Sequence, residues 1–154
     1  MRRFVLLGLA TAGLVGVAVA QTPARTPAEL IQNRQAGYKQ IGAAFRGLFE
    51  QTRASEPNPA TIRQHSATIA RLAPNVSGWF PAGTGPETGL RTRAKAEIWT
   101  SPQDFRTGSV NLVVAARRME QAAAGSDMAA IREAFRALQG TCAACHDRFR
   151  GPEI

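Results

Sequence analysis

Hydrophobic positions recur every three to four residues in four stretches of the chain, a spacing typical of helices with one apolar face. The first stretch begins at Pro27, with Thr26 as N-cap, and ends between Arg53 and Glu56 because Pro57 follows. Its apolar stripe consists of Leu30, Ile31, Tyr38, Ile41, Phe45, Leu48 and Phe49.

The other three stretches are bounded by similar local signals. Asn58-Pro59 opens a helix that runs to about Leu72, and Ser101-Pro102 opens the next in the same way. The last follows a turn at Gly125-Ser126-Asp127 and has an apolar stripe of Met128, Ile131, Phe135, Leu138, Cys142 and Phe149. Four amphipathic helices in one small domain predict an all-α fold, an antiparallel up-down-up-down four-helix bundle with its ligand site between facing helices.

A long stretch, residues 73–100, separates the second helix from the third and contains too many prolines and glycines for a long helix. It also contains Trp79, Phe80 and Trp99. A loop of this length with such aromatic side chains is predicted to be packed and functional rather than a linker.

The N-terminus predicts a targeting segment rather than part of the fold. Arg2 and Arg3 precede an apolar run over residues 4–19, and Ala18-Val19-Ala20 is an A-x-A cleavage site. We interpret residues 1–20 as a signal peptide, with a retained anchor as the alternative, and residues 21–154 as one domain. Export predicts a periplasmic location.

The formal charge is +8, and arginine provides nearly all of the positive charge. A basic surface can bind nucleic acid, but the predicted export removes that partner. Two interpretations stay open, a solvated basic face and electrostatic steering toward an acidic redox partner.

The chemistry of the chain is concentrated in Cys142-Ala143-Ala144-Cys145-His146, which reads C-x-x-C-H, the attachment signature of c-type haem. Two thiols at this spacing can each join one vinyl group of a porphyrin, and the adjacent imidazole can bind the iron. Alternatives are a redox dithiol, half of a zinc site and a disulfide. A redox dithiol requires a preceding strand, and zinc requires further ligands, for which the chain offers only His65 and no other cysteine.

With its signal peptide, four helices and a C-x-x-C-H near the C-terminus, the chain resembles the class II c-type cytochromes, in particular the cytochrome c′ family, itself a standard example of the bundle. The ordinary class I cytochromes carry the motif near the N-terminus. Further matches are Arg34-Gln35 followed by Tyr38, Trp79-Phe80, Glu97-Ile98-Trp99, and Arg150 four residues after His146.

The resemblance implies one covalent haem c per chain, with thioethers at Cys142 and Cys145 and His146 as the only protein ligand to iron. It also places Arg34 and Gln35 near the haem propionates, Glu97 close to the haem, and Arg150 on the side of His146. For both arginines the alternative is a surface side chain that packs its stem on the helix.

At the sixth coordination position the family match places Tyr38, where low-spin relatives have methionine. We predict a five-coordinate iron with an apolar pocket blocked by Tyr38 and lined by Phe45 and Phe105, because a phenol with a pKa of about 10 has no evident base to ionise it. Three other residues could be ligands in principle. We interpret Met119 and Met128 as core filler and His65 as an ordinary histidine.

The predicted function is therefore electron transfer, binding of diatomic gases such as NO and CO, or both. The alternative is a nitric oxide carrier that does not transfer electrons. An enzyme of the peroxidase type would need an acid-base group beside the iron, which the sequence does not supply. The resemblance also implies a homodimer formed through the first two helices, and a redox partner that the sequence does not identify.

Overall fold

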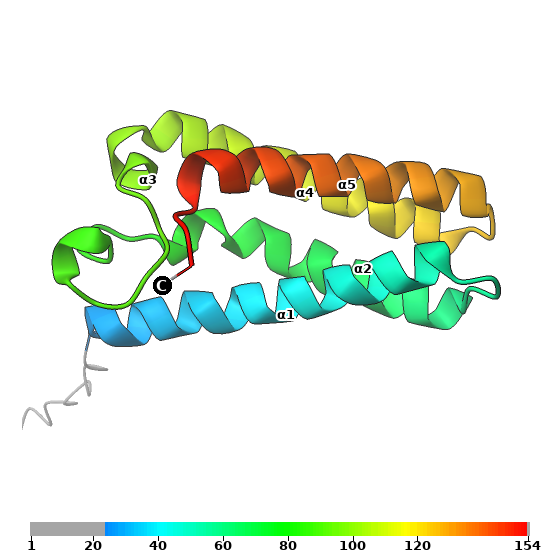
Figure 1. The fold of residues 1–154 in the computed structure, drawn as a ribbon, viewed down its shortest axis with the longest axis horizontal. Coiled ribbons are helices and arrows are strands. Elements are labelled where there is room, and N and C mark those ends of the chain that lie inside the picture. Colours follow the sequence, from blue (N-terminus) through cyan, green and yellow to red (C-terminus); the bar gives the residue numbers. More distant parts are fainter. Residues whose placement is uncertain (1–23, 154) are drawn as a thin grey trace, which may run out of the picture.

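The computed structural model describes residues 24–153, and its main body is a four-helix bundle. The long helices are α1 (Pro27–Arg53), α2 (Pro59–Leu72), α4 (Pro102–Ala124) and α5 (Met128–Phe149). Successive helices run in opposite directions along the long axis (Figure 1). The prediction of an antiparallel up-down-up-down bundle is therefore confirmed, whereas the predicted signal peptide lies outside the described residues.

The helix starts follow the predicted caps in two of three cases. The Thr26 hydroxyl accepts a hydrogen bond from the Glu29 backbone N–H, and the Glu29 carboxylate accepts one from the Thr26 backbone N–H, which together form a capping box. The Asn58 side chain likewise caps α2. The sequence also predicts Ser101 as a cap, but its side chain makes no cap hydrogen bond. The reason is that its backbone is not in the extended conformation that directs a cap side chain toward the helix N–H groups.

The stretch over residues 73–100 is less irregular than expected. It contains three short 3₁₀ turns (Ala73–Asn75, Ser77–Trp79 and Pro86–Thr88) and a one-turn helix, α3 (Glu97–Thr100). Trp79, Phe80 and Trp99 are half-buried and pack against the core. The aromatic side chains therefore hold the stretch on the bundle, as predicted for a packed loop.

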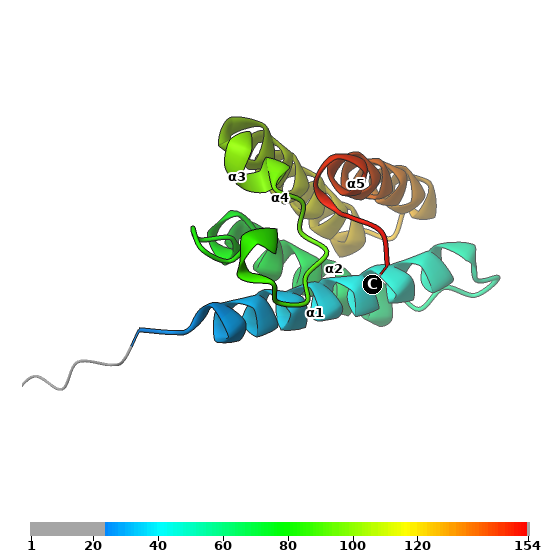
Figure 2. The ribbon, with the colours of Figure 1, turned by 60° about the vertical axis from the view of Figure 1, so that its left-hand side comes forward.

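The chain end is tied to the same loop. The backbone N–H of Gly151 donates to the Arg93 carbonyl at 2.7 Å, and the N–H of Lys95 donates to the Phe149 carbonyl at 3.0 Å. In the turned view the C-terminal segment lies between α5 and α1 (Figure 2). The loop, the end of α5 and the start of α1 thus meet at one end of the bundle. Within residues 24–153 no helix is long and apolar enough to cross a membrane.

Candidate functional site

A cavity of about 670 Å³ lies at this end of the bundle, between α1, the loop, α4 and the last turns of α5. Its volume is in the range of cofactor pockets in proteins. Seven of the eight residues expected to bind the cofactor line it, namely Arg34, Gln35, Tyr38, Cys142, Cys145, His146 and Arg150. Phe45 and Phe105 line it too, as expected.

The two cysteines of the C-x-x-C-H motif both line the cavity, because positions three residues apart share a helix face. Both thiols are free, so the structure does not support a disulfide. Burial, and secondarily the charge of Cys145, raises the pKa of the Cys142 thiol to about 11, and burial raises the pKa of Cys145. In residues 24–153 no group of three or more His, Cys, Asp and Glu residues could hold a metal ion, so the zinc interpretation finds no further ligands.

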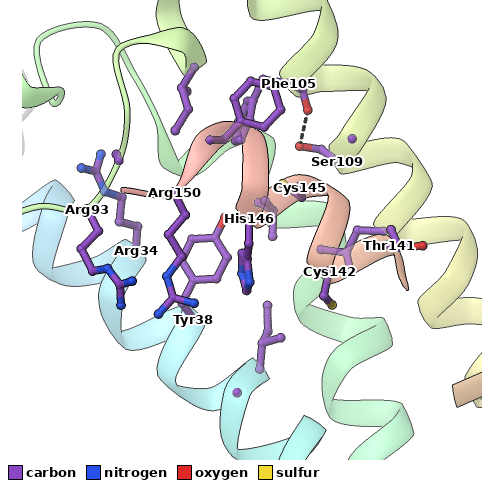
Figure 3. A pocket seen from close by; sticks show the side chains of 18 of the residues that line it. Arg34, Tyr38, Arg93, Phe105, Ser109, Thr141, Cys142, Cys145, His146 and Arg150 are labelled. Carbon is purple, nitrogen blue, oxygen red and sulfur yellow. Dashed lines mark hydrogen bonds between the residues drawn. The ribbon is translucent and has the colours of Figure 1, made fainter. Parts of the chain in front are cut away.

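His146 enters the cavity from the same helix, next to the cysteines (Figure 3). Burial lowers the pKa of its imidazole, and the positive charges of Arg150 and Arg93 lower it further. These effects favour the neutral imidazole, which is the form whose nitrogen can bind a metal.

Arg34 is 2% exposed and lies at one end of the cavity. Its guanidinium donates to the Thr84 hydroxyl at 3.0 Å and to the Thr92 hydroxyl at 2.7 Å, and it lies 4.7 Å from the centre of the Phe80 ring. Burial lowers its pKa. Among the described residues no carboxylate forms a direct ion pair with it, although the charge of Glu87 acts on it from a distance and opposes part of the effect of burial.

Tyr38 enters the cavity from α1, so that it and His146 come from different helices (Figure 3). Its ring packs edge-on against Trp79, with centroids 5.2 Å apart, and beside Phe80 at 6.2 Å. Burial raises the pKa of the phenol, which therefore stays protonated at neutral pH. This protonation supports a steric role over ligation as phenolate.

These residues fit a haem. The two thiols and a neutral imidazole occupy one helix, and the aromatic rings supply an apolar enclosure. The buried Arg34 has no direct ion pair among the described residues, and a propionate could form one. When bound, the haem would supply an iron that changes oxidation state and binds small ligands.

The comparison with known families agrees with this geometry. The profile described as Cytochrome C′ matches residues 29–150, which is most of the chain. The chain belongs to the cytochrome c′ family.

Among relatives, the cytochrome c′ of Pararhodospirillum photometricum is 30% identical over 125 residues, covering 81% of this chain and 98% of that protein. A solved cytochrome c′ described as having ligand-controlled dimer dissociation is 25% identical and covers 84% of this chain and 100% of its own, with a TM-score of 0.78. A nitric oxide complex of a variant cytochrome c′ from Alcaligenes xylosoxidans shares the fold at 21% identity, with a TM-score of 0.76 and coverage of 85% and 100%. Cytochromes c′ are haem proteins, so this chain is a member of a haem-binding family.

Three other expectations for this cytochrome c′ family member concern residues around the site. The exposed Glu97 begins α3 and does not line the cavity, whereas its neighbour Ile98 does. Its side chain is thus not brought to the site, and a role for its backbone stays a prediction. Met119 is fully buried in the core, and neither it nor Met128 lines the cavity.

His65 also lies outside the cavity lining, where it packs against Gly47. Sequence reasoning missed Arg93, Thr84 and Thr92. Arg93 and Thr92 line the cavity, and the hydroxyls of Thr84 and Thr92 accept hydrogen bonds from Arg34. No motif marks these three residues, because the path of the loop alone brings them to α1.

Proposed function

We propose that the chain is a periplasmic cytochrome c′ with one haem c attached through Cys142 and Cys145, which binds diatomic gases and transfers electrons. The observation that carries the proposal is the cavity lining. In the described part of the chain, the lining contains His146 as its one histidine and contains no methionine. His146 is therefore the proposed sole protein ligand of the iron, which would be five-coordinate.

Two of the hydroxyl groups that line the cavity offer no proton to a bound ligand, which favours nitric oxide or carbon monoxide over dioxygen. Ser109 and Thr141 line the cavity, but the first hydroxyl donates to the Phe105 carbonyl at 2.9 Å and the second to the Ala137 carbonyl at 3.0 Å. These hydroxyl protons are used within their own helices and do not reach a bound ligand. Bound dioxygen depends on hydrogen-bond donors in the pocket more than carbon monoxide or nitric oxide do.

Tyr38 adds a steric cost to every ligand. A molecule entering on its side must displace a ring that packs against Trp79 and Phe80. The nitric oxide complex of a variant in the family supports nitric oxide as a ligand. The alternative function, a nitric oxide carrier that does not exchange electrons, rests on this same pocket.

Electron transfer is proposed because the haem would lie close to the surface between α1 and α5, where Lys39, Arg46, Ala143 and Arg150 line the cavity and are exposed. The partner would be another redox protein. We also propose a homodimer formed through α1 and α2, in keeping with the dimer described for one solved relative. We propose no catalytic reaction.

The test is the spectroscopy of the protein produced in a periplasm that attaches haem. We expect one haem per chain that resists acid-acetone extraction, and a high-spin ferric signal in paramagnetic resonance. Adding nitric oxide or carbon monoxide to the ferrous protein should shift the Soret band. Cys142→Ser and Cys145→Ser should each leave a single thioether, and the double variant should lose covalent haem.

A colourless protein would contradict haem binding altogether. A low-spin iron with a sulfur ligand would contradict the open sixth position. Electron exchange with no Soret response to either gas would exclude gas binding and support electron transfer alone. Tight nitric oxide binding without electron exchange at useful rates would favour the nitric oxide carrier.

A further inference from the structure

The cavity lining is strongly asymmetric in charge. It contains five basic residues and no Asp or Glu among the residues described, the five being Arg34, Lys39, Arg46, Arg93 and Arg150. The whole chain has 19 basic and 11 acidic side chains in 154 residues, so an even distribution would place about two carboxylates among the 26 lining residues.

These cations differ in burial and in their interaction partners. Arg34 is buried against Thr84 and Thr92, and Arg93 pairs with Glu153 at 3.2 Å. Lys39, Arg46 and Arg150 are exposed, and none of them belongs to the ion pairs found in residues 24–153. Haem binding, for which Arg34 and Gln35 are proposed, leaves the exposed cations of α1 uncompensated.

Lys39 and Arg46 lie on one face of α1, because their seven-residue separation is about two helical turns. Gly42 lies between them on that face, and a Cβ atom there would meet only the Arg46 Nη1 atom, at 3.6 Å. Across the opening, α5 presents the exposed Ala143, and Gly140 has open space around it. The surface between the cations is thus formed by small residues and leaves the cavity approachable.

We propose that this surface, the α1–α5 rim (Lys39, Gly42, Arg46, Ala143 and Arg150), docks an acidic redox protein. The inference rests on the proposed function and names the chemistry of its electron-transfer partner. Uncompensated charges of one sign attract a partner of opposite sign and raise its association rate. The small residues allow its surface to come close to the edge of a bound haem.

A second copy of the chain is a poor occupant of the same rim. A two-fold symmetric contact would bring the same cations of both copies together, and facing like charges oppose association. The rim is therefore proposed for a different protein, separate from the dimer contact through α1 and α2.

The experiment compares two double variants of the haem-loaded protein that change the net charge equally. Lys39→Glu/Arg46→Glu alters the rim. Arg71→Glu/Arg117→Glu alters exposed arginines of α2 and α4 that do not line the cavity. The Soret band and circular dichroism report whether each variant holds haem and is folded. If the rim variant fails to fold, the milder Lys39→Gln/Arg46→Gln replaces it.

Two readouts are used. Surface plasmon resonance measures adsorption on carboxylate-terminated and on ammonium-terminated monolayers, which gives a binding signal independent of redox activity. Stopped flow measures oxidation of the ferrous protein by hexacyanoferrate(III), in which one electron leaves the haem iron and yields hexacyanoferrate(II).

We expect the rim variant to lose adsorption on carboxylate and to react with hexacyanoferrate about tenfold more slowly than wild type at low salt. The Arg71/Arg117 variant should stay close to wild type. The difference should vanish at high salt, because the Debye length falls from about 30 Å at 0.01 M to about 3 Å at 1 M.

Equal losses in both double variants would mean that net charge alone acts, and would overturn the proposal. Rates and adsorption that are independent of the rim charges would overturn it as well. Failure of the proposed function would look different, since the protein would then lack a haem band or would transfer no electron to hexacyanoferrate at any salt concentration.

Discussion

The indole of Trp79 occupies the position that a Cβ atom on Gly37 would take. Such an atom would lie 2.3 Å from Cη2 and 2.5 Å from Cζ2 of the indole, far inside van der Waals contact. The same indole meets the next residue, Tyr38, edge-on. The absence of a side chain at Gly37 therefore lets a loop residue lie on α1 and support the ring that blocks the pocket.

Gly37→Ala should displace Trp79 and loosen Tyr38. Overpacking of this kind costs about 1–3 kcal/mol, offset in part by the better helix propensity of alanine, about 1 kcal/mol. We expect faster carbon monoxide association, because Tyr38 loses its edge contact. Flash photolysis of the holoprotein measures the rate, and urea unfolding measures the stability.

Gly140→Ala is the matched control, because Gly140 lies within α5 outside the cavity lining, and a Cβ there meets nothing within 4 Å, so only the helix propensity changes. Gly37→Ala should be less stable than this control by about 1–3 kcal/mol. Equal stability and equal carbon monoxide rates in the two variants would show that Trp79 does not depend on Gly37.

Removing the Tyr38 ring should open the pocket, whereas removing only its hydroxyl should not. We expect Tyr38→Ala to bind carbon monoxide at least about tenfold faster, which corresponds to about 1.4 kcal/mol less barrier. Tyr38→Phe should keep the wild-type rate and spectrum, because the phenol is protonated and acts by bulk. A changed ferric spectrum in Tyr38→Phe would instead indicate that the oxygen binds iron.

The contribution of Arg34 to stability should depend on its planar guanidinium and not only on its charge. In Arg34→Lys a single ammonium cannot reproduce the bonds to both Thr84 and Thr92, so we expect a loss of about 1–3 kcal/mol in stability. Urea unfolding of the holoprotein measures it. Arg117→Lys, at an exposed position outside the cavity lining and without an ion pair among the described residues, is the control and should change stability little. Equal losses of stability in Arg34→Lys and in the control would refute a special role for the buried Arg34 guanidinium.

The capping box predicts a pH dependence. The Thr26 backbone N–H, and then its hydroxyl, lower the pKa of Glu29 in the folded chain. A depressed folded pKa stabilises the fold above the unfolded value of about 4.3, and this contribution is lost as pH falls through the folded value. Glu29→Gln can keep a hydrogen bond but carries no charge, so its unfolding free energy should fall less steeply in acid. Parallel pH profiles for wild type and variant would contradict this.

The helices and the haem motif could be predicted from the sequence because the signals for both are local. Apolar spacing, proline positions and the Thr26 and Asn58 caps act within one or two turns, and Cys142, Cys145 and His146 need only their own helix to share a site. The signal peptide and the cleavage after Ala20 stay predictions, since they concern residues outside those described.

The tertiary structure alone decided which distant residues meet. Arg93 reaches the cavity, Trp79 lies on Gly37, and Glu97 stays outside, because the path of the loop over the bundle sets all three positions. No periodicity or motif encodes that path. It follows from packing between segments far apart in the chain, where each contact depends on all the others being formed.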